Sequence, residues 1–367
     1  MVPPAAPQAF DFARAPFLVV WEVTRACALA CVHCRADAIA RRDPDQLTTE
    51  EGFGLIDEIR GFGVQPPLLV LTGGDPMLRR DLADLVRYAS RAGLSVALTP
   101  SGTAAATRRR LEELRDAGLR RVAVSLDGPD AETHDAFRGV RGSYQWTMRI
   151  IDAVQELGLP LQVNTTISRL TLPHFPAMVR RVSQLPLALW AVFFLIKTGR
   201  GAALDQIDAR ECENVLERLD ELSQTAPFGI KTTEAPHFHR VIRQRHADPS
   251  RTPPSAARPN PRAAIRAPRS VTDGNGFVFV DHRGDICPSG FLPLACGNVR
   301  RDSLVRVYRE HELFVKLRDP DALEGKCGRC EFRGVCGGSR ARAYEATGSA
   351  FGSDPLCAYE PGLTASL

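Results

Sequence analysis

Lysine is scarce in this chain of 367 residues, and long hydrophobic runs are missing. Only four of the 47 basic residues are lysines, so arginine carries almost all of the positive charge. We attribute this bias to a GC-rich genome, and we interpret arginine runs such as Arg108–Arg110 as solvated helix faces. A nucleic-acid surface would interleave aromatic residues with these charges, and none are present. The small net charge of +4 also predicts no nucleic-acid partner.

Two kinds of membrane or export signal are absent as well. No run of about 18 apolar residues exists, which argues against a membrane-spanning helix. The segment Met1–Ala15 lacks the charged start and apolar run of a signal peptide. A cytoplasmic protein without membrane contact is therefore expected. Because the cytosol keeps thiols reduced, the ten cysteines are expected to bind metal rather than form disulfides.

Short apolar runs alternate with amphipathic stretches through most of the chain. Strands are predicted at 17–23, 68–71, 95–99, 121–126, 162–166, 189–196 and 230–234, and helices at 49–61, 80–92, 103–117, 144–157, 173–184 and 209–225. This alternation indicates an α/β fold with a parallel sheet buried on both faces. Six or more such units can curl into a partial (β/α)6 barrel, an incomplete version of the TIM barrel. The active site of such a fold lies at the carboxyl ends of its strands.

The composition divides the chain into four parts. We predict a disordered N-terminus at 1–16, a β/α core at 17–235, a linker with a Pro/Arg-rich loop at 236–275, and a small Cys-rich domain at 276–363. Residues 248–269 contain few large apolar side chains and cannot bury much surface. Residues 276–286 resemble a hairpin, and a helix is expected near 304–311. The Gly- and Cys-rich stretch 325–363 has too small a core to fold without metal.

Three cysteines, Cys27, Cys31 and Cys34, follow the first predicted strand. Three thiolates cannot complete a tetrahedral zinc site by themselves, whereas on a cubane iron–sulfur cluster they leave one iron open. An open iron can bind a small molecule directly, which gives the site a chemical use. The plain alternative is a structural zinc or a chance cluster.

A second group of cysteines lies near the C-terminus, at Cys327, Cys330, Cys336 and Cys357. Zinc and an iron–sulfur cluster both accept four thiolates. Upstream, Cys287 and Cys296 could begin a further auxiliary cluster, although they lack an evident full set of partners. The alternative is that these two are buried or free thiols. Cys212 lies in a helical pattern and is expected to be structural.

The spacing Cys27-x3-Cys31-x2-Cys34 resembles the signature of the radical S-adenosylmethionine (SAM) superfamily, with His33 where an aromatic residue often stands. The resemblance implies that SAM binds the open iron of a [4Fe–4S] cluster. An electron, supplied by a donor such as ferredoxin or flavodoxin, would cleave SAM to methionine and a 5′-deoxyadenosyl radical that abstracts hydrogen from a substrate. The cofactor carries the difficult chemistry, and the protein supplies orientation and excludes water. No catalytic side chain is identified.

Several positions after the predicted strands resemble the SAM contacts of this family. Gly73-Gly74-Asp75-Pro76 is similar to the family's Gly-Gly-Glu-Pro motif, which binds the amino group of SAM, with Asp75 one methylene shorter. The resemblance also implies that the ribose and carboxylate of SAM meet a second set of residues: Ser101, Ser125, Asp127 and Asn164. Taken alone, each of these residues would be a turn or a cap. Arg138 follows in a loop that fits the family, without an assigned role.

The stretch 326–359 resembles the C-terminal cluster domain called SPASM. This resemblance implies at least one auxiliary [4Fe–4S] cluster, held by the four C-terminal cysteines, that takes an electron from the substrate and makes the net reaction an oxidation. Ser339 stands where many two-cluster members have a further cysteine. The sequence therefore leaves open whether the chain holds one auxiliary cluster or two.

The resemblance covers nearly the whole chain and leaves two substrate classes, ribosomal peptides and tetrapyrrole (haem) precursors. The tetrapyrroles carry several carboxylates, which Arg200, Arg340 and Arg342 could bind bidentately. The alternative is that these arginines form structural ion pairs. We see no peptide-recognition domain ahead of Phe17, which weakens the case for a peptide. The competing hypothesis for the whole chain is a non-catalytic iron–sulfur or zinc scaffold.

Overall fold

One curved sheet organises the protein. The computed structural model describes residues 10–63, 65–247 and 270–362. Within them the sheet has ten strands in the order β10-β9-β8-β1-β2-β3-β4-β5-β6-β7, with β10 and β7 at its two edges. Every neighbouring pair from β8 to β7 is parallel, and only the β8–β9 and β9–β10 pairs are antiparallel. The open edges confirm the predicted α/β class and the partial barrel.

Strands β1 to β7 match the predicted apolar runs to within a few residues, β8 and β9 form the predicted hairpin, and β10 was not predicted. They are β1 (Leu18–Glu22), β2 (Leu68–Thr72), β3 (Val96–Leu98), β4 (Leu119–Ser125), β5 (Leu161–Ile167), β6 (Leu189–Phe194), β7 (Gly229–Thr233), β8 (Phe277–Val280), β9 (Asp285–Cys287) and β10 (Gly297–Asn298).

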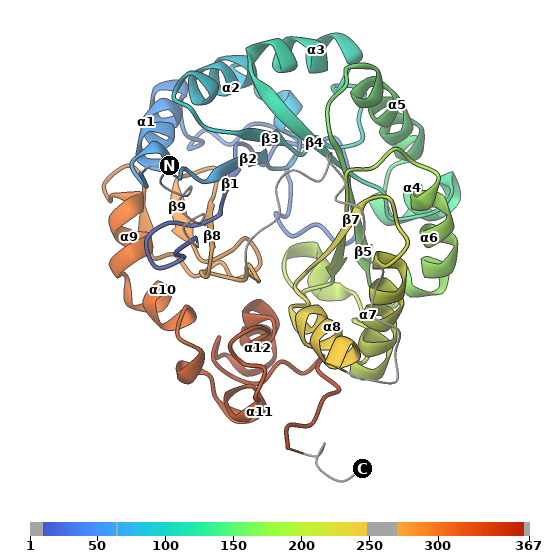
Figure 1. Ribbon diagram of the computed structural model, residues 1–367. Helices are drawn as coiled ribbons and strands as arrows, with labels where there is room; N and C mark the ends of the chain where they lie inside the picture. Colours follow the sequence, from blue (N-terminus) through green and yellow to red (C-terminus); the bar gives the residue numbers. More distant parts are fainter. Residues whose placement is uncertain (1–9, 64, 248–269, 363–367) are drawn as a thin grey trace, which may run out of the picture.

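Helices surround the curved sheet on its outer side, and the C-terminal helices lie below its opening (Figure 1). They are α1 (Thr49–Arg60), α2 (Leu82–Arg91), α3 (Arg108–Ala117), α4 (Ala131–Arg138), α5 (Ser143–Glu156), α6 (Phe175–Ser183), α7 (Ala209–Ser223), α8 (His237–Ala247), α9 (Leu304–Glu310), α10 (Glu312–Leu317), α11 (Gly325–Arg329) and α12 (Arg340–Thr347). None of the helices in the described part of the chain is long and apolar enough to cross a membrane.

Caps fix where the helices begin. Thr48 accepts a hydrogen bond from the Glu51 backbone while the Glu51 carboxylate accepts one from the Thr48 backbone, so α1 opens on a capping box. Helix α3 was expected from residue 103. It begins later because the Thr107 side chain accepts a hydrogen bond from the Arg110 N–H, which places the cap there.

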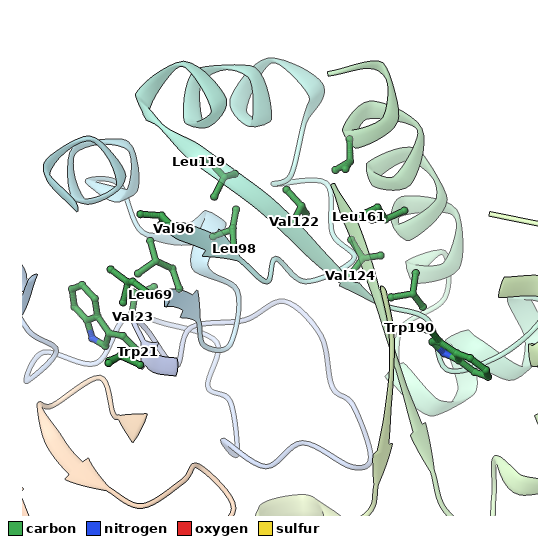
Figure 2. Packing of buried hydrophobic residues seen from close by; sticks show 14 of the residues in the cluster. Trp21, Val23, Leu69, Val96, Leu98, Leu119, Val122, Val124, Leu161 and Trp190 are labelled. Carbon is green, nitrogen blue, oxygen red and sulfur yellow. The ribbon is translucent and has the colours of Figure 1, made fainter. Parts of the chain in front are cut away.

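The two faces of the sheet have different surroundings. Successive residues of a strand point to opposite faces. One set, including Trp21, Leu69, Val122 and Trp190, is buried in a single core between strands and helices (Figure 2). The alternate set, which begins with Val20 on β1, points into the barrel and is absent from this core. The helices thus stabilise the outer face and leave the inner face to line a site.

Three of the predicted boundaries need correction. Residues 10–16 of the expected disordered N-terminus are ordered, because Phe12 is buried and its carbonyl accepts a 2.7 Å hydrogen bond from Tyr308 Oη. The start of the predicted linker forms α8, which buries Phe238 and Val241; residues 248–269 lie outside the described residues. The predicted hairpin, now β8 and β9, pairs with β1 and continues the core sheet.

We expect the outer core to carry much of the stability. Leu71→Ala, at a fully buried position on β2, should lower the free energy of unfolding by about 2–5 kcal/mol through lost burial and a cavity. Leu170→Ala makes the same change at a position that is 55% exposed and should cost about 0.5 kcal/mol or less. Chemical denaturation of both variants measures the difference. Equal losses would contradict this packing.

Candidate functional site

The first three cysteines lie in an irregular segment that follows β1 at the carboxyl edge of the sheet. Cys27 donates its N–H to the Ile39 carbonyl at 2.9 Å, which closes the segment into a loop, and Cys34 N–H meets the Cys31 carbonyl at 3.2 Å. All ten cysteines of the chain are free of disulfides. This agrees with the expectation that they serve as ligands or thiols. The segment from Thr24 to Ile39 is called the cysteine loop below.

The Gly73-Gly74 turn after β2 is hydrogen-bonded directly to the cysteine loop. Gly74 N–H donates to the Thr24 carbonyl at 2.8 Å, and Asp75 N–H donates to the Ala26 carbonyl at 2.7 Å. A Cβ atom on Gly73 would lie 2.2 Å from the Thr24 oxygen, and one on Gly74 would lie 2.4 Å from the Ala26 oxygen. Only glycine permits this backbone approach. The turn therefore fixes where the first cysteine stands.

The carboxylate of Asp75 is occupied by protein donors. It is fully buried. Thr103 Oγ1 donates to Oδ2 at 2.6 Å, and the Met77 N–H donates to Oδ1 at 3.1 Å. Burial raises the pKa of Asp75, and the hydrogen bond from Thr103 partly offsets that rise. In this structure Asp75 joins the loops after β2 and β3, and the backbone of the glycine pair is the part of the motif nearest the cysteines.

Three other expected SAM contacts lie on this edge of the sheet. Ser101 Oγ donates to the Gly74 carbonyl at 2.6 Å and lies 3.7 Å from Cys27 Sγ. Ser125 and Asn164 are opposite each other in the register of β4 and β5. Their strand positions place both on the inner face, half-buried. The structure thus brings Ser101 close to Cys27, and it places Ser125 and Asn164 on the inner face of the sheet.

Asp127 holds a cation against the second cysteine. Its buried carboxylate forms an ion pair with Arg138 and accepts the Thr166 N–H at 2.7 Å. Burial would raise the pKa of Asp127, but the Arg138 charge lowers it below its usual value. Arg138 Nη1 in turn lies 3.7 Å from Cys31 Sγ. Arg138 is a site residue to which sequence reasoning gave no role; the helix that presents it, α4, was not predicted.

Arg200 braces the cysteine loop from the opposite side. Its Nε donates to the Cys31 carbonyl at 2.9 Å, and its Nη1 donates to the Ala38 carbonyl at 3.2 Å. The hypothesis that Arg200 binds substrate carboxylates stays a prediction, since Nη2 of this side chain has no hydrogen-bond partner among the described residues. The guanidinium is used to hold the loop.

Arg340 and Arg342 also have structural roles. Arg342 is fully buried and pairs with Asp354 at 3.1 Å. Arg340 is buried and donates to the carbonyls of Ala350 at 3.0 Å and Gly352 at 2.9 Å. Arg342 forms the structural ion pair that the alternative expected, whereas Arg340 is held by hydrogen bonds to carbonyls and not by an acid.

The four C-terminal cysteines gather around one pocket. The pocket is open to solvent and has a volume of about 340 Å³ including its mouth. Its lining includes all four thiols, namely Cys327, Cys330, Cys336 and Cys357. Three cations, Arg240, Lys326 and Arg333, share this lining. A cluster held by four thiolates is an anion, so the basic lining fits such a group. Cysteines separated by up to thirty positions of irregular chain thus reach one site.

His237 is a second residue that sequence reasoning missed at this pocket. It is buried, lines the pocket, and has Nε2 3.2 Å from Asp354 Oδ2. Burial would raise the pKa of the Cys357 thiol, but the neighbouring His237 lowers it, which favours a thiolate. The residue lies at the start of α8, inside the stretch predicted as a linker, so no sequence signal marked it.

Cys287 and Cys296 are apart from both groups. Cys287 is buried on β9, and Cys296 N–H donates to the Ile286 carbonyl at 2.8 Å. Burial raises the pKa of the two thiols to about 12 and about 11, respectively. A further cluster at these two thiols and the alternative of buried or free thiols both stay predictions.

The thiol arrangement separates a cluster from zinc. The thiolates around one zinc ion lie about 3.8 Å apart, since Zn–S is about 2.3 Å with tetrahedral angles. In the described residues, no three His, Cys, Asp or Glu side chains gather as ligands of a single ion. A cubane spreads its cysteines over the corners of a cube and needs a wider arrangement. Three thiols in one loop would leave one corner of a cubane open, and four thiols around one pocket match the four corners of another.

Comparisons with known proteins agree with this geometry. The model of the Radical SAM superfamily matches residues 21–182. An AdoMet-dependent heme synthase of Oleidesulfovibrio alaskensis is 41% identical over 346 residues, 94% of this chain and 87% of that protein. The protein of that name from Methanosarcina barkeri is 38% identical over 355 residues, covering 95% and 98% of the two chains.

Other similar proteins are more distant. A PqqA peptide cyclase of Bradyrhizobium diazoefficiens is 28% identical over 360 residues, 94% of this chain and 87% of that protein. Among solved structures, Streptococcus suis SuiB bound to S-adenosylmethionine has a TM-score of 0.71 at 16% identity, over 94% of this chain and 78% of that one. At this level of identity, the similarity to SuiB concerns the fold alone.

The contact between the glycine turn and the cysteine loop gives a direct test. Gly74→Ala should displace the loop, because its Cβ would lie 2.4 Å from the Ala26 oxygen. We expect about half of the iron to be lost after anaerobic reconstitution, since only the first cysteine group is affected. Gly54→Ala, where a Cβ would meet nothing within 4 Å, is the matched control. Full iron content in Gly74→Ala would contradict the account.

Proposed function

This chain belongs to the Radical SAM superfamily and is an enzyme, and we propose that it makes heme from a carboxylated iron-tetrapyrrole with SAM. The family gives it SAM and a [4Fe–4S] cluster as cofactors. The observation that carries the choice of substrate is the degree of identity: relatives named AdoMet-dependent heme synthase match nearly the whole chain far more closely than the peptide cyclase does. The residues around the cysteines are consistent with this activity.

We assign the SAM-binding cluster to Cys27, Cys31 and Cys34. When bound, this cluster and SAM together supply the radical that removes a hydrogen atom from the substrate. The residues of the chain hold and orient them. The cation of Arg138, fixed beside Cys31 by Asp127, is suited to the SAM carboxylate.

The remaining SAM contacts are assigned by position. The backbone of Gly73 and Gly74 approaches the cysteine loop most closely, and we assign it to the SAM amino group. Ser101 lies next to Cys27, and Ser125 and Asn164 lie on the adjoining inner face. We assign these three to the rest of the SAM molecule. Asp75 and Asp127 would act indirectly, by holding the glycine turn and Arg138.

The second cysteine group would hold one auxiliary [4Fe–4S] cluster. The electron balance of the reaction requires an acceptor. A propionate becomes a vinyl group, the substituent of heme, by losing a hydrogen atom, carbon dioxide and one electron. The hydrogen atom goes to the SAM-derived radical, and the electron needs a site in the protein. The pocket of Cys327, Cys330, Cys336 and Cys357, with its basic lining, is suited to hold such an acceptor.

We further infer that the enzyme works in the cytoplasm and receives its priming electron from ferredoxin or flavodoxin. Both proteins are acidic electron carriers of low reduction potential, and they can therefore supply the strongly reducing electron that SAM cleavage needs. Cys287 and Cys296 are not needed for this scheme. Their surroundings fit buried thiols.

Cysteine variants test the assignment. Cys31→Ala should abolish formation of 5′-deoxyadenosine from SAM under dithionite, and with it heme formation from iron-coproporphyrin III, while the absorbance of the C-terminal cluster remains. Cys212→Ala, at a buried position on α7 outside the lining of the C-terminal cysteine pocket, should keep both activities. Chromatography of the anaerobic reaction measures the two products.

The outcomes separate the enzyme from a scaffold. A fully iron-loaded wild type that forms no 5′-deoxyadenosine would contradict the radical reaction altogether. Formation of 5′-deoxyadenosine without turnover of iron-coproporphyrin III would contradict the substrate. Unchanged product from Cys31→Ala would contradict the cluster ligands.

A further inference from the structure

Two cations point into the barrel from strands that are not neighbours. Arg121 on β4 alternates with Val122, which belongs to the outer core, and Lys231 on β7 alternates with Ile230, which packs against that core. Both side chains therefore face inward. Strands β5 and β6 separate β4 from β7 in the sheet. The sheet curls into a partial barrel (Figure 1), so both cations face the space that its inner side partly encloses.

Neither cation has a partner among the described residues. No hydrogen bond or ion pair from Arg121 or Lys231 is formed within residues 10–63, 65–247 and 270–362. Other buried arginines in the same range have partners: Arg240 and Arg342 pair with Glu213 and Asp354, and Arg340 donates to backbone carbonyls. Arg121 is only 8% exposed. Lys231 is half-buried. A cation that is largely removed from water and has no anion is costly, so these two are suited to an anion that comes from outside the chain.

The electrostatics of Lys231 show that the two groups act on one space. Burial lowers the pKa of the Lys231 ammonium, and the nearby charge of Arg121 lowers it further, to about 8. Burial also lowers the pKa of Arg121. Small side chains separate them along the sheet, since Lys231 is paired with Ala191 and Ala123 lies two residues beyond Arg121.

The place of this pair in the sheet connects it with the reaction site. Lys231 is level with Ala191, which pairs with Asn164, which pairs with Ser125. The last two are the inner-face residues assigned to SAM. An anion held by Lys231 therefore lies on the same inner face as SAM, beneath the cysteine loop.

The opposite half of the inner face carries several apolar side chains beside the buried Glu22–Arg35 ion pair. Val20 on β1, Val70 on β2 and Phe277 on β8 are half-buried and belong to no core cluster. Phe193 on β6 is also half-buried, and its ring centroid is 6.4 Å from that of Phe291. A face with apolar and aromatic groups on one side and two free cations on the other suits a flat apolar ring with carboxylates at its edge.

We propose that Arg121 and Lys231 together bind a propionate carboxylate of the tetrapyrrole, with the macrocycle lying on the apolar half of the inner face. This inference rests on the proposed function and adds a substrate subsite to it. The subsite is distinct from Arg138, which is fixed at Cys31 and assigned to the SAM carboxylate. The two carboxylate-bearing ligands thus meet separate cations.

Substitution of each cation tests the subsite in the reconstituted holoenzyme under anaerobic conditions. Binding of iron-coproporphyrin III, followed by its Soret absorbance, should weaken at least about tenfold in Lys231→Met and in Arg121→Met. Lys231→Arg keeps the charge and should bind within about threefold of wild type. Arg120→Gln removes an exposed cation from the neighbouring position on β4 and should bind like wild type.

Two further readouts exclude a structural role and a SAM site. Without porphyrin, Lys231→Met should melt at or above the wild-type temperature, because it removes an unpaired buried charge. Cleavage of SAM without substrate should be unchanged in both methionine variants. The tetramethyl ester of the porphyrin should bind wild type weakly, and the substitutions should weaken that binding no further.

Each contrary result identifies what fails. Wild-type affinity for the porphyrin in both methionine variants would overturn the subsite and leave the proposed function standing. Lower melting temperatures with intact binding would make the residues structural, and lost SAM cleavage would assign them to SAM; both overturn the subsite. A wild type that binds no iron-coproporphyrin III would overturn the proposed function and the subsite together.

Discussion

The close contact between the cysteine loop and its neighbours is the constraint on which the site depends. The loop has almost no regular structure and no core of its own. Glycines from three other loops, at Gly73, Gly74, Gly139 and Gly199, lie so near that a Cβ on any of them would be 2.2 to 2.4 Å from a loop carbonyl. Arg200 adds hydrogen bonds from a further side. The sheet thereby positions three thiols through backbone contacts, and it leaves their side chains free to bind a cluster.

The buried cations of the described chain differ in whether they have partners within it. Most buried arginines are neutralised within the chain or donate to carbonyls, as Arg240, Arg342 and Arg340 do. Arg138 has its acid in Asp127 and still reaches Cys31. Arg121 and Lys231, on the inner face, have neither an anion nor a carbonyl partner among the described residues. These two cations have no partner within the described chain, and for that reason we assign them to a ligand.

The sequence predicted the strands and the cysteine groups because these signals are local. Apolar runs identify strands, and the Cys27–Cys34 spacing occurs within one loop. It could not predict Arg138, because that residue depends on α4 packing against the cysteine loop. His237 was hidden in a stretch that resembles a linker, and the pairing of β8 with β1 joins residues far apart in the chain. Strand alternation can show that Arg121 and Lys231 face inward, but their meeting needs the curvature of the sheet. Asp75 and Asp127 were placed at the right edge, and their carboxylates were found to bind protein donors.

The central claim is that three cysteines leave one iron of the first cluster open to SAM. Electron–nuclear double resonance of the reduced holoenzyme, with SAM labelled by ¹⁵N in its amino group and ¹⁷O in its carboxylate, measures this contact directly. The account predicts magnetic coupling of both labels to one cluster, present in wild type and absent in Cys34→Ala. A reduced cluster whose spectrum is indifferent to labelled SAM, or zinc in place of iron at these cysteines, would contradict it.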